Sequence, residues 1–560
     1  MTRSKLIIIS FSVLLLSLLI VVPVTAEPRN IVVGNTKEWQ SLYLASMYAG
    51  LTDAEIIFFK NLGDSQIKSR TIGKDDNIII LESNKKPVVK NYESFLRVNG
   101  YKNFKTISFD GYEDLQEFLF DDVDTNGVFV TNSQFGIDAV SATPLIIKER
   151  YKPIFITENN LDYVKKNVKP GKTIISGYIP VRWVSGLAGE KIIGYPFETN
   201  KELTDLVVER NPNQWGSITK IDTIDLESIK QGIPVFVFYG TSYLDVVANS
   251  IKKSGIKNFE VIGAGTSDIA KALETGAGEN LNMLLKYGRT ITNVPGLEGK
   301  ILDIDAVKFG FPVENLKIEK VTYYPNLETL GITFTNEGNI DLMLYTNAEY
   351  ASSAVSDEFP HQILVGQTKT IPFPLADVTG GTDAIITTRY GYDFPFRNGI
   401  SDKDGNPIFR TNVETDSHSE TPTLEFRSSS YDHELGVLKL RYFNSGLNDV
   451  KAYSELKISD ELVLSSDIET IEAGKERTIA IKTPYVESSE LSENTFPIVT
   501  YYGEEDTLKS VYGEVFIEKP SFGLTGLVAG LGGGVTLIAS ISALIIIGLI
   551  IFFIVRKKRR

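Results

Sequence analysis

The segment Ile78-Ile79-Ile80-Leu81 is a continuous apolar run, and Val235-Phe236-Val237-Phe238 is a second run of the same kind. Strands in parallel sheets lose polar alternation because helices cover both faces of the sheet. The sequence therefore predicts a helix-covered parallel sheet for its first part. We expect strands at 31–33, 55–59, 77–81, 104–108, 128–131, 153–157, 173–176, 234–238 and 259–262, with helices at 39–51, 88–98, 137–149, 198–208 and 243–253.

This half of the sequence repeats itself. The run 128–130 and the run 235–237 lie 107 residues apart, and Asp138 and Asp245 keep the same offset. A second repeated segment pairs residues 100–104 with residues 255–259, and each begins with a glycine where a helix is expected to end. We interpret the pattern as a strand–helix–strand–helix unit used about four times, in one sheet or in several.

From residue 316 onward the pattern is all-β, with frequent Gly, Pro and Asn. Residues 335–338 recur as 443–446, and residues 365–371 recur as 473–479, both at an offset of 108. The predicted domains are a repeated α/β domain at 27–315, immunoglobulin-like β-sandwiches at 316–394 and 422–519, and a linker at 395–421 between the sandwiches.

The two ends of the chain predict membrane targeting. Arg3 and Lys5 precede an apolar run and then small residues, which is typical of a signal peptide at 1–26. Residues 535–555 carry no charge and are long enough for a transmembrane helix, and the five bases of 556–560 predict a cytoplasmic tail. We expect a single-pass type I protein of the cell membrane with an extracellular ectodomain.

Composition excludes several classes of protein. Residues 27–520 hold 50 bases against 71 acids, whereas a nucleic-acid binder needs a basic face. The chain has no cysteine, and its three histidines, His361, His418 and His433, all lie in the C-terminal half. A Ser–His–Asp triad within the α/β half is therefore excluded, and we expect no enzyme and no cofactor. A carboxylate pair for glycoside hydrolysis is left open, because its separation depends on the fold.

One glycine-rich turn lies where a dinucleotide-binding motif would begin. Gly263-Ala264-Gly265 lies between an expected strand and an expected helix, where backbone amides bind phosphate. Asp268 stands where that motif has its third glycine. A tight turn of the repeat is the interpretation that we favour.

Both halves resemble known families. The first resembles the putative cell-wall-binding repeat type 2 family, through Gly127-Val128-Phe129-Val130, Asp138-Ala139-Val140-Ser141-Ala142, Pro153-Ile154-Phe155-Ile156-Thr157 and the turn at 261–267. The second is similar to CARDB-like (cell-adhesion-related) modules of archaeal surface-layer-type proteins. The resemblance implies an envelope protein with a structural, adhesive or polymer-binding role, whose partners are envelope polysaccharide, surface-layer proteins or further copies of itself.

Two acidic loops have the alternating oxygen ligands and the glycine that calcium loops use. The possible ligands are Asp122, Asp124 and Asn126 in the first loop, and Asp402, Asp404 and Asn406 in the second. Acidic turns before strands are also common in solvated loops, which is the alternative interpretation.

Two functions fit this organisation. The first is a membrane-anchored cell-envelope protein with a structural, surface-layer-type role. The alternative is a receptor or adhesin whose α/β domain binds an extracellular polymer or solute at the carboxyl ends of the parallel strands. The candidate ligand-binding residues are Asn35, Thr36, Asn132, Ser133, Tyr239, Thr241, Gly265 and Thr266.

Overall fold

The computed structural model describes residues 27–220, 224–225, 230–262, 266–277, 281–286, 288–290, 301–303, 306–307, 309–376, 378, 381–401, 408–417, 423–492 and 494–518. It divides into two compact units. The α/β unit comprises the described residues up to 317 with 336–344 and 387–409, and the β unit comprises those of 318–335, 345–386 and 410 onward. Each unit is considered by itself.

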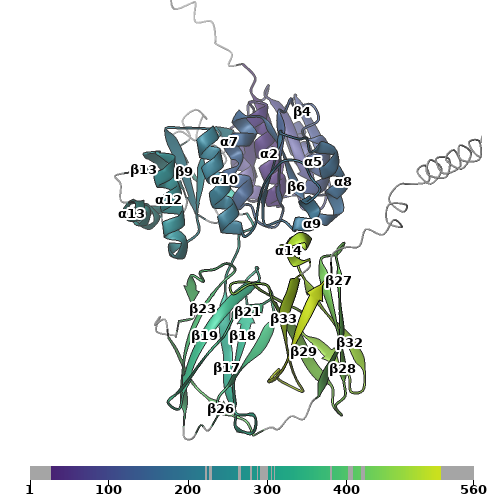
Figure 1. The fold of residues 1–560 in the computed structure, drawn as a ribbon. Helices are drawn as coiled ribbons and strands as arrows, with labels where there is room; N and C mark the ends of the chain where they lie inside the picture. Colours follow the sequence, from purple (N-terminus) through teal and green to yellow (C-terminus); the bar gives the residue numbers. More distant parts are fainter. Residues whose placement is uncertain are drawn as a thin grey trace, which may run out of the picture. The chain divides into compact units, whose positions relative to one another are not determined.

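The α/β unit contains three separate parallel sheets of four strands (Figure 1). In each sheet, the strand that comes first in the sequence lies between the strands that come second and third, so the strand order reverses beside it. The unit that recurs is therefore a whole four-stranded sheet, present three times in the described residues, and it is larger than the predicted strand–helix–strand–helix unit. The sheets are β2(Glu55–Phe58)-β1(Asn30–Asn35)-β3(Asn77–Ser83)-β4(Phe104–Phe109), then β6(Tyr151–Ile156)-β5(Gly127–Asn132)-β7(Thr173–Gly177)-β8(Glu190–Ile193), then β11(Val235–Phe238)-β9(Trp215–Lys220)-β12(Asn258–Ile262)-β13(Asn282–Lys286).

Helices connect these strands. They are α2(Trp39–Leu51), α3(Leu62–Ser69), α4(Tyr92–Val98), α5(Tyr112–Phe118), α6(Ile137–Ser141), α7(Thr143–Lys148), α8(Leu161–Asn167), α9(Val181–Val184), α10(Pro196–Arg210), α12(Leu244–Ser254) and α13(Thr266–Ala277). The single helix predicted at 137–149 is two helices, because Pro144 lies in the first turn of α7 and interrupts the ladder of backbone hydrogen bonds. Helix α4 begins later than predicted, after Asn91, which has a left-handed backbone with φ of 56°.

One face of the first sheet is buried by apolar packing. Ile31 and Val33 of β1 and Ile78 and Ile80 of β3 share a core with helix α4. Side chains alternate between the faces of a strand, so Val32 and Ile79 point to the opposite face. That opposite face carries the groove described below.

The C-terminal half forms β-sandwich-like sheets, as predicted. The first pair has the order β22(Thr368–Pro374)-β18(Thr329–Asn336)-β17(Leu316–Tyr324)-β26(Glu414–Thr415) and β20(Ser353–Ser356)-β19(Leu342–Tyr350)-β23(Asp383–Gly391)-β24(Asn398–Gly399), to which β21(His361–Ile363) and β25(Phe409–Asn412) add. The second pair has the order β27(Leu424–Asp432)-β28(Val437–Asn444)-β32(Glu476–Lys482) and β30(Val463–Ser465)-β29(Val450–Lys457)-β33(Asn494–Gly503)-β34(Lys509–Ile517), with β31(Glu469–Ile471) on β29. Leu438, Val450, Ile479 and Ile498 are buried between the sheets of the second pair.

The predicted fold class needs one correction. Among the residues that the structure describes, no helix combines the length and the apolar character that a membrane span requires. The predicted span at 535–555 lies outside the described residues, as do the predicted signal peptide at 1–26 and the tail at 556–560. We therefore remove the transmembrane helix from the fold class and withdraw the single-pass location in the cell membrane.

Candidate functional site

The predicted site residues of the first sheet are engaged within the fold. The Asn35 side chain donates from Nδ2 to Glu82 Oε2 and to the Val89 carbonyl, both at 2.7 Å. Its Oδ1 accepts from the backbone N–H groups of Val88 and Val89. Thr36 is buried, and its hydroxyl accepts a hydrogen bond from the backbone N–H of Glu38, the residue before α2. Asn35 therefore stabilises the loop after β3, and Thr36 stabilises the turn between β1 and α2.

The other predicted residues fall in the second and third sheets. Asn132 Oδ1 accepts from the Phe135 N–H at 2.7 Å, the Ser133 carbonyl accepts from Gln40, and the buried Tyr239 hydroxyl donates to Asn200 Oδ1. Thr241 lies in the 3₁₀ helix η2(Thr241–Tyr243) and Thr266 begins α13, but the side chains of both, and Gly265, are outside the described residues. The five predicted residues whose side chains are described lie beside three different sheets: Asn35 and Thr36 beside the first, Asn132 and Ser133 beside the second, and Tyr239 beside the third.

Asp138, which was not predicted as a site residue, is the centre of a buried polar cluster in the second sheet. Its carboxylate is fully buried, and the Ser176 hydroxyl donates to its Oδ1 at 3.5 Å. Burial raises the pKa of Asp138 to about 7, against hydrogen bonds from Asn200, Ser176 and Thr199 that lower it. The signals in the sequence are the repeat of this residue as Asp245 and its place at the start of the segment 138–142, one of the segments that carry the family resemblance.

The cluster around Asp138 is closed by close packing. Gly177 has φ of 127°, and a Cβ atom built on it would lie 2.7 Å from Asn132 Nδ2 and 3.1 Å from Asp138 Oδ2. Only glycine suits this backbone without strain. Those two polar atoms and Thr131 Oγ1 are buried and have no hydrogen-bond partner among the described residues. We regard the cluster as an interior feature that sets stability.

The first predicted calcium loop, at 122–126, makes hydrogen bonds to Arg150, the residue before β6. The side chains of Asp122, Asp124 and Asn126 are exposed. Asn126 donates from its backbone to the Arg150 carbonyl at 2.8 Å, and Arg150 Nε donates to the Asp124 carbonyl at 2.9 Å. Within the described ranges no three acidic or histidine side chains are placed to hold a metal ion. The second loop, with Asp402, Asp404 and Asn406, lies outside those ranges, so calcium binding stays a prediction.

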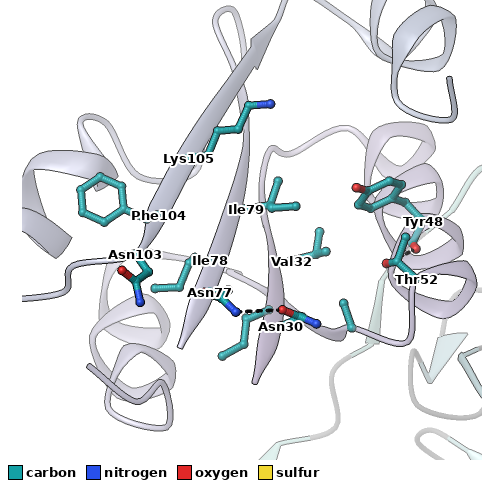
Figure 2. Close-up of a pocket in the computed structure, with 12 residues that line it drawn as sticks. Asn30, Val32, Tyr48, Thr52, Asn77, Ile78, Ile79, Asn103, Phe104 and Lys105 are labelled. Atoms are coloured by element: carbon teal, nitrogen blue, oxygen red, sulfur yellow. Dashed lines mark hydrogen bonds between the residues drawn. The ribbon is translucent and has the colours of Figure 1, made fainter. Parts of the chain in front are cut away.

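A groove of about 440 Å³ lies at the opposite edge of the first sheet from the predicted site. Figure 2 shows Asn30, Asn77 and Asn103 along the amino ends of β1, β3 and β4. Val32 and Ile79 lie two residues further along β1 and β3. Tyr48 of α2 and Thr52, which directly follows that helix, form the facing wall. The groove thus has a polar row and an apolar row on one face of the sheet.

The polar row is neutral and accessible. Asn30, Asn77 and Asn103 are exposed, and each amide can donate and accept hydrogen bonds. The apolar row is continued on β4 by Lys105, which is also exposed. Open pockets that combine an apolar surface with a few placed polar groups are the usual sites for ligands. Sequence reasoning missed this site because its three asparagines come from three different strands.

Comparisons with known proteins assign neither a family nor a function to the chain. No family model matches the chain, and no curated protein matches it. Similar solved structures include the YadV chaperone (12% identity, covering 36% of this chain and 98% of that one, TM-score 0.13). A second is CBD12 from CALX1.2, with 12% identity, covering 33% of this chain and 80% of that one, at a TM-score of 0.14. A third is a tetra-tandem repeat of a large adhesion protein, with 11% identity, covering 40% of this chain and 54% of that one, at a TM-score of 0.14. Scores this low carry no functional argument, and none of the three is a cell-wall-binding repeat.

Proposed function

We propose that the protein is a non-enzymatic binding protein of the cell envelope, and that the groove of its first sheet takes a hydroxyl-rich polymer of the polysaccharide class. The observation that supports this proposal is the row of amides beside the row of apolar side chains. A sugar ring has the same two-sided chemistry, with hydroxyl groups at its edge and C–H bonds on its faces. The aromatic ring of Tyr48 offers a further apolar surface for such a ring.

The lining of the groove also supports binding without catalysis. Its twelve residues include neither a carboxylate nor a histidine. Glycoside hydrolysis uses a pair of carboxyl groups, and general acid–base catalysis uses groups that titrate near neutral pH. The envelope assignment is supported by the resemblance of the repeats to the cell-wall-binding family, which is why envelope polysaccharide is the polymer proposed.

The proposal is tested by measuring the binding of the purified full chain to a panel of soluble polysaccharides. Asn77→Ala and Tyr48→Ala are expected to lower affinity about tenfold, a loss of about 1.4 kcal/mol. The matched control is Asn282→Ala, because Asn282 donates to Asn258 Oδ1 at 3.0 Å just as Asn77 donates to Asn30 Oδ1 at 3.1 Å. The control should bind like the unaltered protein. Binding that ignores both groove substitutions, or no binding to any polysaccharide, contradicts the proposal.

A structural, surface-layer-type role is the second candidate. The observation that favours it is a buried network of charges, centred on Glu455, that joins strands of both sandwich pairs inside the β unit. Such a network holds its strands in one arrangement. Ordered two-dimensional arrays of the purified chain in electron micrographs would support this role, and a monomer at all concentrations would contradict it.

A further inference from the structure

The three asparagines of the groove are aligned across three neighbouring strands. The register pairs Asn30 of β1 with Asn77 of β3. It also pairs Ile78 of β3 with Phe104 of β4, so Asn103 lies beside Asn77. Neighbouring strands are about 4.8 Å apart, so the three amides repeat at about that interval in a straight line.

A second row runs parallel to the first. Val32 is paired with Ile79, and Ile79 with Lys105, two residues further along each strand and on the same face. The groove floor is therefore a grid with three columns, one for each strand. Each column offers one amide; beside the amides, Ile79 is half-buried and the methylene groups of the exposed Lys105 continue its apolar surface, whereas Val32 is buried beneath the groove.

The amides retain hydrogen-bonding capacity. Asn77 donates from Nδ2 to Asn30 Oδ1 at 3.1 Å, and Asn103 donates from Nδ2 to the Asp75 carbonyl at 3.2 Å (Figure 2 shows the first bond). Asn30 Nδ2 and the Oδ1 atoms of Asn77 and Asn103 have no partner within the described part of the chain. These bonds also orient the row, so each column presents a preorganised polar group.

This inference rests on the proposed function and names the ligand class. We infer that the groove binds an extended, neutral, β-1,4-linked polysaccharide that crosses the strands with one sugar unit over each of β1, β3 and β4. The spacing of about 4.8 Å between columns is close to the length of one pyranose unit in such a chain. An α-1,4-linked chain coils away from a straight line, whereas a β-1,4-linked chain stays extended, with its successive units turned over about the chain axis. Among the residues lining the groove only Lys105 is charged, and its single positive charge stands against a net charge of −14 for the whole chain, which disfavours an anionic polymer.

The test is a length series measured by calorimetry on the full chain. The probes are β-1,4-linked gluco-oligosaccharides of one to six units and α-1,4-linked gluco-oligosaccharides of the same lengths. Affinity for the β series should rise about tenfold per added unit up to three units and then level off, because the groove has three columns. A preference for the α series, or affinity that does not depend on length up to three, would overturn the inference.

Variants at the end of the row sharpen the test. Asn103→Ala should reduce the affinity for the three-unit β ligand to that for the two-unit ligand, while leaving the two-unit affinity unchanged. Asn282→Ala should change neither. If the α series binds and depends on Asn77, the ligand class is wrong but the proposed function stands. If no saccharide binds, both are wrong.

Discussion

His361 Nδ1 lies 2.8 Å from Glu455 Oε2, and both side chains are buried within the β unit. His361 belongs to β21 and Glu455 to β29, so the pair joins strands of the two sandwich pairs. Lys369 Nζ lies 2.8 Å from the other oxygen of Glu455, and His361 Nε2 lies 3.1 Å from Asp357 Oδ1. No charge in this group is left without an opposite charge, which buried ions require.

The first prediction concerns the pH dependence of this group. Burial lowers the pKa of His361, but Glu455 and Asp357 outweigh it and raise the pKa to about 10. Burial raises the pKa of Glu455, but Lys369 and His361 outweigh it and lower the pKa to about 2. The contribution of His361 is complete below its unfolded pKa near 6.5 and is lost as the pH rises through 10. That of Glu455 is complete above about 4.5 and is lost as the pH falls through 2.

The combined contribution of His361 and Glu455 to the stability of the β unit should therefore be greatest between about pH 4.5 and 6.5. His361→Gln should cost about 3 to 5 kcal/mol and remove the decline above pH 6.5. Denaturant unfolding followed by circular dichroism at several pH values measures both effects. A variant that keeps the alkaline decline would show that another group causes it.

The second prediction concerns Asp138. Its folded pKa of about 7 is above the unfolded value of 3.8, so its stabilising contribution is complete below about pH 4 and is lost as the pH rises through 7. The stability of the α/β unit should fall by about 4 kcal/mol across this range, and Asp138→Asn should remove the fall. All three tryptophans, Trp39, Trp183 and Trp215, lie in this unit, so tryptophan fluorescence reports its unfolding. An equal fall in the variant would exclude Asp138 as the cause.

The third prediction is that Asn35 is a structural residue. Asn35→Ala leaves the partly buried N–H groups of Val88 and Val89 without their acceptor, at a cost of about 3 kcal/mol. The control is Asn84→Ala, whose exposed side chain donates only to Asp110 and should cost less than about 0.5 kcal/mol. Fluorescence-monitored unfolding compares them, and equal costs would contradict the structural role.

The fourth prediction concerns the hairpin between β19 and β20. Its two loop residues, Ala351 and Ser352, have φ of 49° and 68°, which is the left-handed region at both positions. Two-residue turns of this type favour Asn followed by Gly. The double substitution Ala351→Asn, Ser352→Gly should stabilise the β unit by about 1 kcal/mol. Unchanged stability in the circular dichroism assay would show that the turn is not strained.

Much of the α/β architecture could be predicted, because buried parallel strands are apolar runs. Each of the nine predicted strand segments overlaps a strand of the structure. The strands β8, β9 and β13 were missed. In β8 only Ile192 is buried, and β13 is a partly exposed edge strand whose apolar run, at 283–285, is short. The central strand β9 contains Gly216, Ser217 and Thr219, which do not form an apolar run.

The groove could not be predicted, because it depends on register between strands that are far apart in the sequence. The repeat of residues 102–104 as residues 257–259 places an asparagine before an expected strand in both copies. Only the pairing of β1, β3 and β4 shows that Asn30, Asn77 and Asn103 form a row. Among the predicted site residues, Asn35 lies at the expected edge of the sheet, and its side chain makes hydrogen bonds to Glu82 and to the backbone of Val88 and Val89, which the sequence does not show.

The separation of the α/β unit into three sheets has a consequence for synthesis on the ribosome. The strands of the first sheet lie within residues 30–109, those of the second within 127–193 and those of the third within 215–286. Each sheet can therefore pair its strands as soon as its own stretch has emerged, before translation of the next is complete. A nascent chain stalled after the second stretch should already protect the amides of β1, β3 and β5 from exchange.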